Sequence, residues 1–174
     1  MNNTCNTTID WNSKKVVIIN DITFQSRRGI DWKKVEDYLK RSIGKSFEIA
    51  ETSEKIYIDT DFPDEFSHSN DTKKLKGANM KAKANLISAI GDLIQTATDL
   101  TSYPDYNKKH GSKAKLGWHR YTIYFGIPVY DEQENLKRYN IFSGRMLIRC
   151  DENRKQYLYD IVRIKKETSR PLEQ

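Results

Sequence analysis

The alternation of apolar and polar residues is clearest in GWHRYTIYFGIPVYDEQENLKRYNIFSGRMLIRCDENRKQYLYDIVRIKK, residues 117–166. Three runs rich in β-branched and aromatic residues occupy positions 118–130, 139–150 and 157–166, and the polar segments DEQENLK and DENRK separate them. Such runs are typical of strands, and short polar segments between them are typical of hairpin turns. The stretch therefore predicts an antiparallel meander of three strands.

Neighbouring side chains along a strand point to opposite sides of a sheet, so each run separates into two faces. One face is apolar and predicts the core, with Tyr121, Ile123, Phe125, Ile127, Val129, Phe142, Met146, Ile148, Leu158, Val162 and Ile164. The other face collects arginine and aromatic residues, with Trp118, Arg120, Thr122, Tyr124, Tyr139, Ser143, Arg145, Arg149, Tyr157, Tyr159 and Arg163. Arginine binds phosphate bidentately and aromatic rings stack on unpaired bases, so this face predicts a surface for single-stranded RNA, unless N-terminal elements cover it.

The strongest helical pattern precedes the meander, in AKANLISAIGDLIQTATDL, residues 82–100. Apolar residues recur three or four positions apart and predict one long helix with an apolar stripe. Lysines, among them Lys81 and Lys83, gather at its N-terminal end, where cations oppose the helix dipole. Because that placement costs stability, it suggests that these lysines serve in binding.

The segment before this helix predicts shorter elements. Residues 15–24 are typical of a strand or a short hairpin. Asp31 can cap a helix that ends at Gly44, and residues 47–49 and 56–58 predict two short strands. The expected fold is α+β, with N-terminal helices and short strands followed by a three-stranded antiparallel meander packed on a long helix.

The chain of 174 residues fits one compact unit. Residues 1–13 are rich in Asn and Thr and predict a flexible lead-in. Residues 14–60 form an N-terminal strand-helix-strand portion, and residues 61–174 form a helix-plus-sheet portion.

Thirty Lys and Arg against twenty-four Asp and Glu give a net charge of +6, which favours RNA or another anionic macromolecule as partner. A merely solubilising charge is the alternative. The sequence lacks a signal peptide and an apolar run of about 20 residues, and its two cysteines are far apart, so we expect a cytoplasmic protein without membrane contact. No motif for a cofactor or metal is present, and the acidic residues at 59–65 lack the spacing of a metal-binding loop.

RNA cleavage through the ribose 2′-hydroxyl needs a base, an acid and a cation for the charge on the phosphorane. His119 could supply the base, Arg120 and Arg145 the cations, and Tyr159 an alternative group for proton transfer. Adjacent strand residues point to opposite faces, so His119 and Arg120 can share one site only at a strand end or a bend. A histidine at the rim of the sheet without a catalytic role is the alternative.

Further candidates would hold RNA without taking part in chemistry, because they are basic or aromatic. These residues are Lys81, Lys83, Lys108, Lys109, Trp118, Tyr124, Arg149, Tyr157 and Arg163.

The segments 61–100 and 117–172 together resemble the large polyvalent protein-associated domains of phages and mobile elements, which are grouped with the barnase/EndoU/colicin/RelE-like nuclease superfamily. The resemblance implies helices followed by an antiparallel sheet and a metal-independent RNase or RNA-targeting toxin. The chain departs from the family's pattern, which has tyrosine where this chain has His119 and histidines near Ser143 and Cys150. A proton-transfer group is therefore missing.

Two functions stay open from the sequence. One is an RNA-binding, metal-independent endoribonuclease-like domain of a phage or mobile element. The other is a non-catalytic binding protein or inhibitor, for example an anti-defence or anti-CRISPR protein, that occupies a nucleic-acid-handling host protein.

Overall fold

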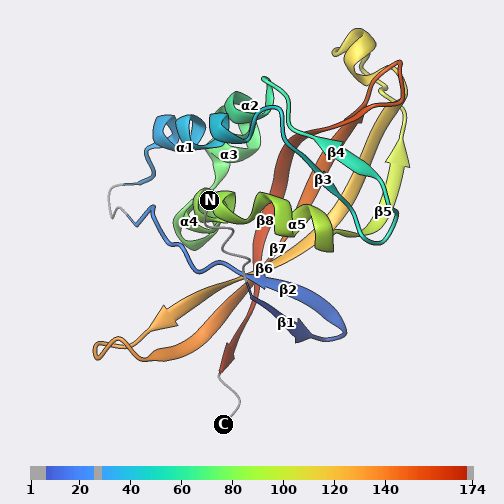
Figure 1. The fold of residues 1–174 in the computed structure, drawn as a ribbon. Coiled ribbons are helices and arrows are strands. Elements are labelled where there is room, and N and C mark those ends of the chain that lie inside the picture. The colour runs from blue at the N-terminus through green and yellow to red at the C-terminus, as the bar shows by residue number, and fades with distance from the viewer. Residues whose placement is uncertain (1–6, 26–28, 172–174) are drawn as a thin grey trace.

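The computed structural model describes residues 7–25 and 29–171, with side chains up to Thr168. The fold is α+β, as the sequence predicts. A mixed sheet curls around a layer of helices, and its long C-terminal strands run through the whole molecule (Figure 1).

The C-terminal meander is confirmed. Its strands are β6 (Gly117–Tyr130), β7 (Leu136–Cys150) and β8 (Gln156–Pro171), which pair antiparallel in sequence order. Asp131 and Asp151 begin the two turns, and each carboxylate accepts two backbone N–H groups at 2.9 Å. An aspartate that hydrogen-bonds the backbone just beyond it stabilises a turn, which explains why both polar segments close hairpins.

Five shorter strands complete the sheet in the described part of the chain. They are β1 (Thr8–Trp11), β2 (Lys14–Ile18), β3 (Ser46–Glu48), β4 (Lys55–Tyr57) and β5 (Thr98–Tyr103). The strand order is β1-β2-β6-β7-β8-β4-β3, and β5 pairs with β6 nearer the start of β6 than β2 does. The strands β3 and β4 confirm the two short strands predicted in this region.

The N-terminal hairpin differs from the prediction. Residues 8–11, predicted as part of a flexible lead-in, form β1 and pair with β2. The turn lies at Asn12 and Ser13, whose φ angles of 48° and 63° are both positive. Two positive φ angles are the mark of the type I′ turn that closes two-residue hairpins. Residues 1–6 of the lead-in lie outside the described residues.

Of the strand or short hairpin predicted within residues 15–24, the strand is present as β2, and the hairpin was wrong. Beyond β2, residues 19–25 contain no strand, and Asn85 of the helical layer holds them instead. Its side chain accepts from the N–H of Phe24 and donates to the carbonyl of Phe24, both at 2.9 Å. The amide thus replaces the ladder partner that this segment lacks.

The helices lie on one side of the sheet (Figure 1). They are α1 (Trp32–Leu39), α2 (Phe62–His68), α3 (Asn70–Lys74), α4 (Gly77–Asn85) and α5 (Ile90–Thr96), with 3-10 turns η1 (Lys40–Ser42), η2 (Leu86–Ala89) and η3 (Gly111–Ala114). Asp31 caps α1 through the N–H of Lys34, as predicted. None of the helices described is long and apolar enough to cross a membrane.

The single long helix predicted from Ala82 to Ala97 is divided into α4, η2 and α5. Its apolar stripe is nevertheless buried. A 3-10 helix has about three residues per turn, close to the value for an α-helix, so residues three or four positions apart still lie on one side of the chain. The buried residues of the stripe are Ala82, Leu86, Ile90, Leu93, Ile94 and Ala97.

This stripe packs against the apolar face of the meander and forms one continuous core. The predicted core residues that are buried are Tyr121, Ile123, Phe125, Phe142, Met146, Ile148, Leu158 and Ile164. Val162 was predicted wrongly, because Ile161 takes the core position instead. Shifts in the register of β8 against β7, including one next to Arg163 with its φ of 54°, change which residues face inward.

Replacing Ile90 by Asp should lower the free energy of unfolding by about 4 kcal/mol or abolish folding, because it buries an unpaired carboxylate in this core. The matched control is Gln95→Asp on the exposed side of α5, which should cost less than about 1 kcal/mol. Urea unfolding followed by circular dichroism measures both, and equal stabilities would refute the core assignment.

Candidate nucleic-acid interface

We call the face of the meander that carries Trp118, Arg120 and Arg145 the outer face. Trp118 lies opposite Arg149 on this face in the pairing of β6 with β7. Arg145 lies opposite Thr122, two residues from Arg120. Arg120 and Arg145 therefore share the outer face, as the alternation predicts.

Two segments cover parts of the outer face. The hairpin of β1 and β2 packs against one end through a second apolar cluster that includes Val16, Ile18 and Ile141. Tyr124 belongs to this cluster, with its ring centroid 6.0 Å from that of Trp11. The prediction that Tyr124 offers an open stacking surface was therefore wrong.

The opposite end of the outer face, covered by the segment between β5 and β6, contains a pocket of about 230 Å³. We call it the aromatic pocket and define it by Tyr103, Tyr106, Lys109, His110, Trp118 and Tyr159. Three of its rings meet edge to face. The centroid of His110 lies 5.2 Å from that of Trp118 and 5.0 Å from that of Tyr159, and the last two lie 5.0 Å apart.

The strands fix the inner wall of the aromatic pocket. Trp118 is buried, and its Nε1 donates to Asp105 Oδ1 at 3.2 Å. Tyr103 lies opposite Trp118 in the pairing of β5 with β6. Gly117 has a φ of 92°, and a Cβ atom there would lie 2.6 Å from the carbonyl oxygen of Tyr103. Only glycine thus lets the two strands approach at this point.

The outer rim of the aromatic pocket is exposed and basic. Tyr106 is 78% exposed, which leaves its ring free to stack on a planar group. Lys108, Lys109 and Lys113 are exposed in the same segment. The pocket therefore combines closely packed aromatic rings with an exposed cationic rim. Aromatic rings beside cations are common in proteins that bind single-stranded nucleic acid.

Arg120 supports the pocket from the side. Its Nη2 donates to the hydroxyl of Tyr103 at 3.2 Å, and its guanidinium carbon lies 5.0 Å from the centroid of that ring. Nε of Arg120 is buried and has no hydrogen-bond partner among the described residues. Arg120 thus holds Tyr103 in place, while its Nε remains a buried donor without a partner.

Arg149 is not available to nucleic acid, contrary to the prediction. Its side chain is 2% exposed, and Nη2 and Nε donate to Asp59 at 3.1 Å and to Asp61 at 3.2 Å. Nη1 donates to the carbonyl of Lys113 at 3.2 Å, and the guanidinium lies over the ring of Tyr157. Arg149 therefore joins β7 to the segment before α2 and to η3, and Tyr157 is part of that contact.

The proposed catalytic residues do not form one site. His119 lies on the core side of β6, where Nδ1 is 3.0 Å from Gln156 Oε1. Gln156 in turn donates to Glu54 at 2.6 Å. Arg120 and Arg145 lie on the other side of the sheet, because adjacent strand residues point in opposite directions.

Tyr159 is unsuited to proton transfer near neutral pH. Burial raises the pKa of its hydroxyl, and the carboxylate of Glu65 raises it further. The phenol therefore stays protonated in the aromatic pocket, where it acts as a ring and as a hydrogen-bond donor.

Lys83 is fully buried, so its predicted contact with nucleic acid was wrong. Its Nζ donates to Thr72 Oγ1 at 2.7 Å and to Asp160 Oδ1 at 3.0 Å. Burial raises the pKa of Asp160, although the ammonium of Lys83 opposes this shift. The pair holds α4 against β8, and Lys81 is exposed on the helical side, away from the aromatic pocket.

Arg145 and Arg163 lie apart from the aromatic pocket. Arg145 is half-buried on the outer face, and Arg163 is exposed at the edge of β8, where its backbone N–H donates to Asp71. Sequence reasoning missed Tyr103, Asp105 and Tyr106. The segment SYPDYNKKHG, in which aromatic residues flank lysines, carried the signal that could have found them.

Comparison with protein-family models, with curated proteins and with solved structures finds no match for this chain. The resemblance to the nuclease superfamily stays a prediction.

Replacing Arg149 by Met should lower the free energy of unfolding by about 2–3 kcal/mol, because it leaves Asp59 and Asp61 facing each other without a cation. The exposed Arg154 offers a matched control, and Arg154→Met should change stability by less than about 0.5 kcal/mol. Chemical denaturation compares the two variants. Equal losses would mean that Arg149 does not hold the pocket segment.

Proposed function

We propose that this protein binds single-stranded RNA by placing an unpaired base in the aromatic pocket and its phosphates on the lysines of the rim, without cleaving it. The observation that supports this most directly is the pocket itself, which gathers aromatic rings of β5, β6 and β8 beside a basic segment.

The size of the pocket suits a single planar ring system. Its volume of about 230 Å³ lies below the roughly 300–1,000 Å³ of pockets that hold drug-sized ligands. A base that stacks on one aromatic side chain gains about 1–3 kcal/mol, and such stacking tolerates any base. We therefore expect binding with little sequence preference, and stronger binding to single strands than to duplexes.

The charge of the protein supports the same proposal. The net charge of +6 attracts polyanions at long range, and part of it lies at the pocket, where Lys109 lines the rim and Lys108 and Lys113 are exposed in the same segment. Each lysine that neutralises a phosphate releases counterions, so the affinity should fall as salt rises.

The same geometry argues against cleavage. His119 and Arg120 lie on opposite sides of β6, and the phenol of Tyr159 stays protonated. A reaction at the 2′-hydroxyl needs these groups around one phosphate. Binding without chemistry is the function that this arrangement supports.

An inhibitor that binds a host protein is the second candidate, and the hairpin at the end of β6 and β7 favours it. This hairpin extends away from the helices (Figure 1), and it carries Tyr130, which is 55% exposed. Exposed tyrosines are common in the centre of protein interfaces.

Tyr106→Ala should weaken binding of a fluorescein-labelled single-stranded RNA by about 5- to 150-fold, the effect of losing one stacked base. Tyr130→Ala is the matched control, since it removes an exposed tyrosine outside the pocket, and its affinity should equal that of the unmodified protein. Fluorescence anisotropy at several salt concentrations measures both. Weaker binding by Tyr130→Ala alone would move the interface to the hairpin.

The salt series tests the rim separately. Lys109→Ala should reduce the slope of log affinity against log salt by about 0.7, whereas Lys34→Ala, on the exposed side of α1, should leave the slope unchanged. The same slope for the unmodified protein, Lys109→Ala and Lys34→Ala would contradict a role for the rim in binding.

Total cellular RNA incubated with the protein in excess chelator should stay intact and migrate more slowly in a native gel. Discrete cleavage products that disappear in His119→Ala would overturn the proposal in favour of an endoribonuclease. RNA that is neither retarded nor cut would favour the protein partner.

A further inference from the structure

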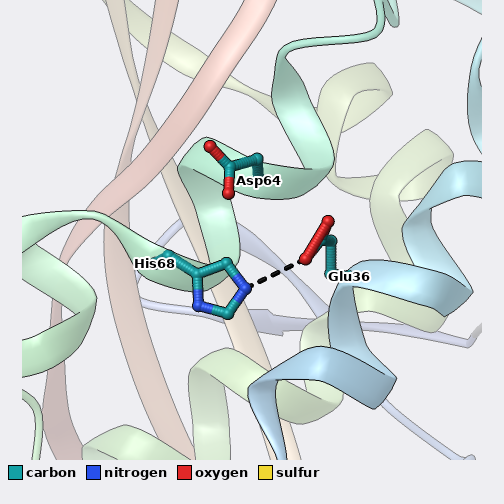
Figure 2. Close-up of side chains that lie close together, drawn as sticks. All are labelled: Glu36, Asp64 and His68. Atoms are coloured by element: carbon teal, nitrogen blue, oxygen red, sulfur yellow. Dashed lines mark hydrogen bonds and ion pairs between the residues drawn. The ribbon is translucent and has the colours of Figure 1, made fainter.

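The helices α1 and α2 pack against each other, and three polar side chains converge between them. Figure 2 shows Glu36 of α1 facing Asp64 and His68 of α2. One oxygen or nitrogen atom from each side chain lies within 4.8 Å of those of the other two. Asp64 and His68 are four residues apart in α2, so one face of the helix presents both.

Two of these side chains already interact. Nε2 of His68 lies 3.0 Å from Oε1 of Glu36, and this hydrogen bond is the main cause that lowers the pKa of Glu36. A carboxylate oxygen of Glu36 and an imidazole nitrogen of His68 thus lie together, and both kinds of atom are metal ligands.

Asp64 brings a second carboxylate to the same place. Among the described residues it has no ion-pair or hydrogen-bond partner, yet its carboxylate points toward Glu36 and His68 (Figure 2). Two carboxylates that converge repel each other unless a cation lies between them. A divalent ion would remove this repulsion and use all three side chains.

We infer that Glu36, Asp64 and His68 form a site for a divalent transition-metal ion, with Zn²⁺ as the expected type. Zn²⁺ accepts imidazole nitrogen and carboxylate oxygen in tetrahedral sites, whereas Mg²⁺ and Ca²⁺ prefer oxygen ligands alone. Three protein ligands leave the fourth position of the tetrahedron to water.

The neighbouring cations do not block the site. Lys33 and Lys40 each lie 3.6 Å from a carboxylate oxygen of Glu36. Both also pair with Asp37, at 3.4 and 3.6 Å, and both side chains are at least half exposed. They keep a partner when Glu36 turns to the ion.

The acidic residues at 59–65 have two different sets of neighbours, and the proposed site explains the position of Asp64. Asp59 and Asp61 face Arg149, whereas Asp64 lies on the other side of α2 with His68. An ion bound there joins α1 to α2, two helices that 22 residues of the chain separate, so it should stabilise the folded state by mass action.

Isothermal titration of ZnCl₂ into chelator-treated protein should show one ion bound per chain, and ZnCl₂ should raise the melting temperature, whereas MgCl₂ should not. His68→Gln and Asp64→Asn should each weaken Zn²⁺ binding by about tenfold or more. The matched controls are His119→Gln and Glu48→Gln, which remove an imidazole and an exposed carboxylate elsewhere and should keep the affinity of the unmodified protein.

The melting temperature in chelator shows whether each variant is folded, and RNA affinity does not enter the test. The inference is overturned if no ion binds at one per chain, if MgCl₂ acts like ZnCl₂, or if His68→Gln and Asp64→Asn each lose less than about tenfold.

Discussion

The guanidinium of Arg149 is the contact on which the arrangement of the outer face depends. A guanidinium is charged at every physiological pH, so burying it demands partners for its donors. Asp59, Asp61 and the carbonyl of Lys113 supply them, from two segments that β7 does not pair with. Through this one side chain the segment before α2 and the turn η3 are fixed to the sheet. The aromatic pocket lies beside that junction, because η3 directly follows the pocket residue His110.

The helical side of the sheet is held by a comparable device. Nζ of Lys83 and Oδ1 of Asp160 lie 3.0 Å apart, and both side chains are buried. This ion pair links α4 to β8 beyond the start of that strand, where β4 no longer pairs with it. Charged groups thus stabilise the fold on both sides of the meander, whereas the exposed lysines beside the aromatic pocket, Lys108 and Lys109, lie in a loop. Loops on a rigid sheet commonly carry function, because they can vary without disturbing the core.

The meander, its core face and the cap at Asp31 could be predicted because each depends on residues close in sequence. Period-two alternation and a single capping side chain are local patterns. Lys83 and Arg149 could not be assigned in this way, since their partners Asp160 and Asp59 lie 77 and 90 residues away. Without knowledge of those two carboxylates, Lys83 and Arg149 would both be expected to be exposed to solvent. The register shifts in β8 could not be predicted for a similar reason, because they depend on how β8 pairs with β7. Within the aromatic pocket, Trp118 and Lys109 were predicted as nucleic-acid contacts and Tyr159 as a proton-transfer group. Tyr103 and Tyr106 were missed, because Tyr103 ends the short strand β5 and Tyr106 lies in the loop after it, where no periodicity marks either residue.

The central claim is that an unpaired base enters the aromatic pocket. The most direct measurement is a nuclear magnetic resonance titration of ¹⁵N-labelled protein with a short single-stranded RNA. The indole N–H of Trp118, which donates to Asp105, should show one of the largest shifts, together with the backbone amides of residues 103–113. Amides of the hairpin at residues 127–141 should not move. Shifts confined to that hairpin or to α4, with the indole resonance of Trp118 unchanged, would contradict the claim.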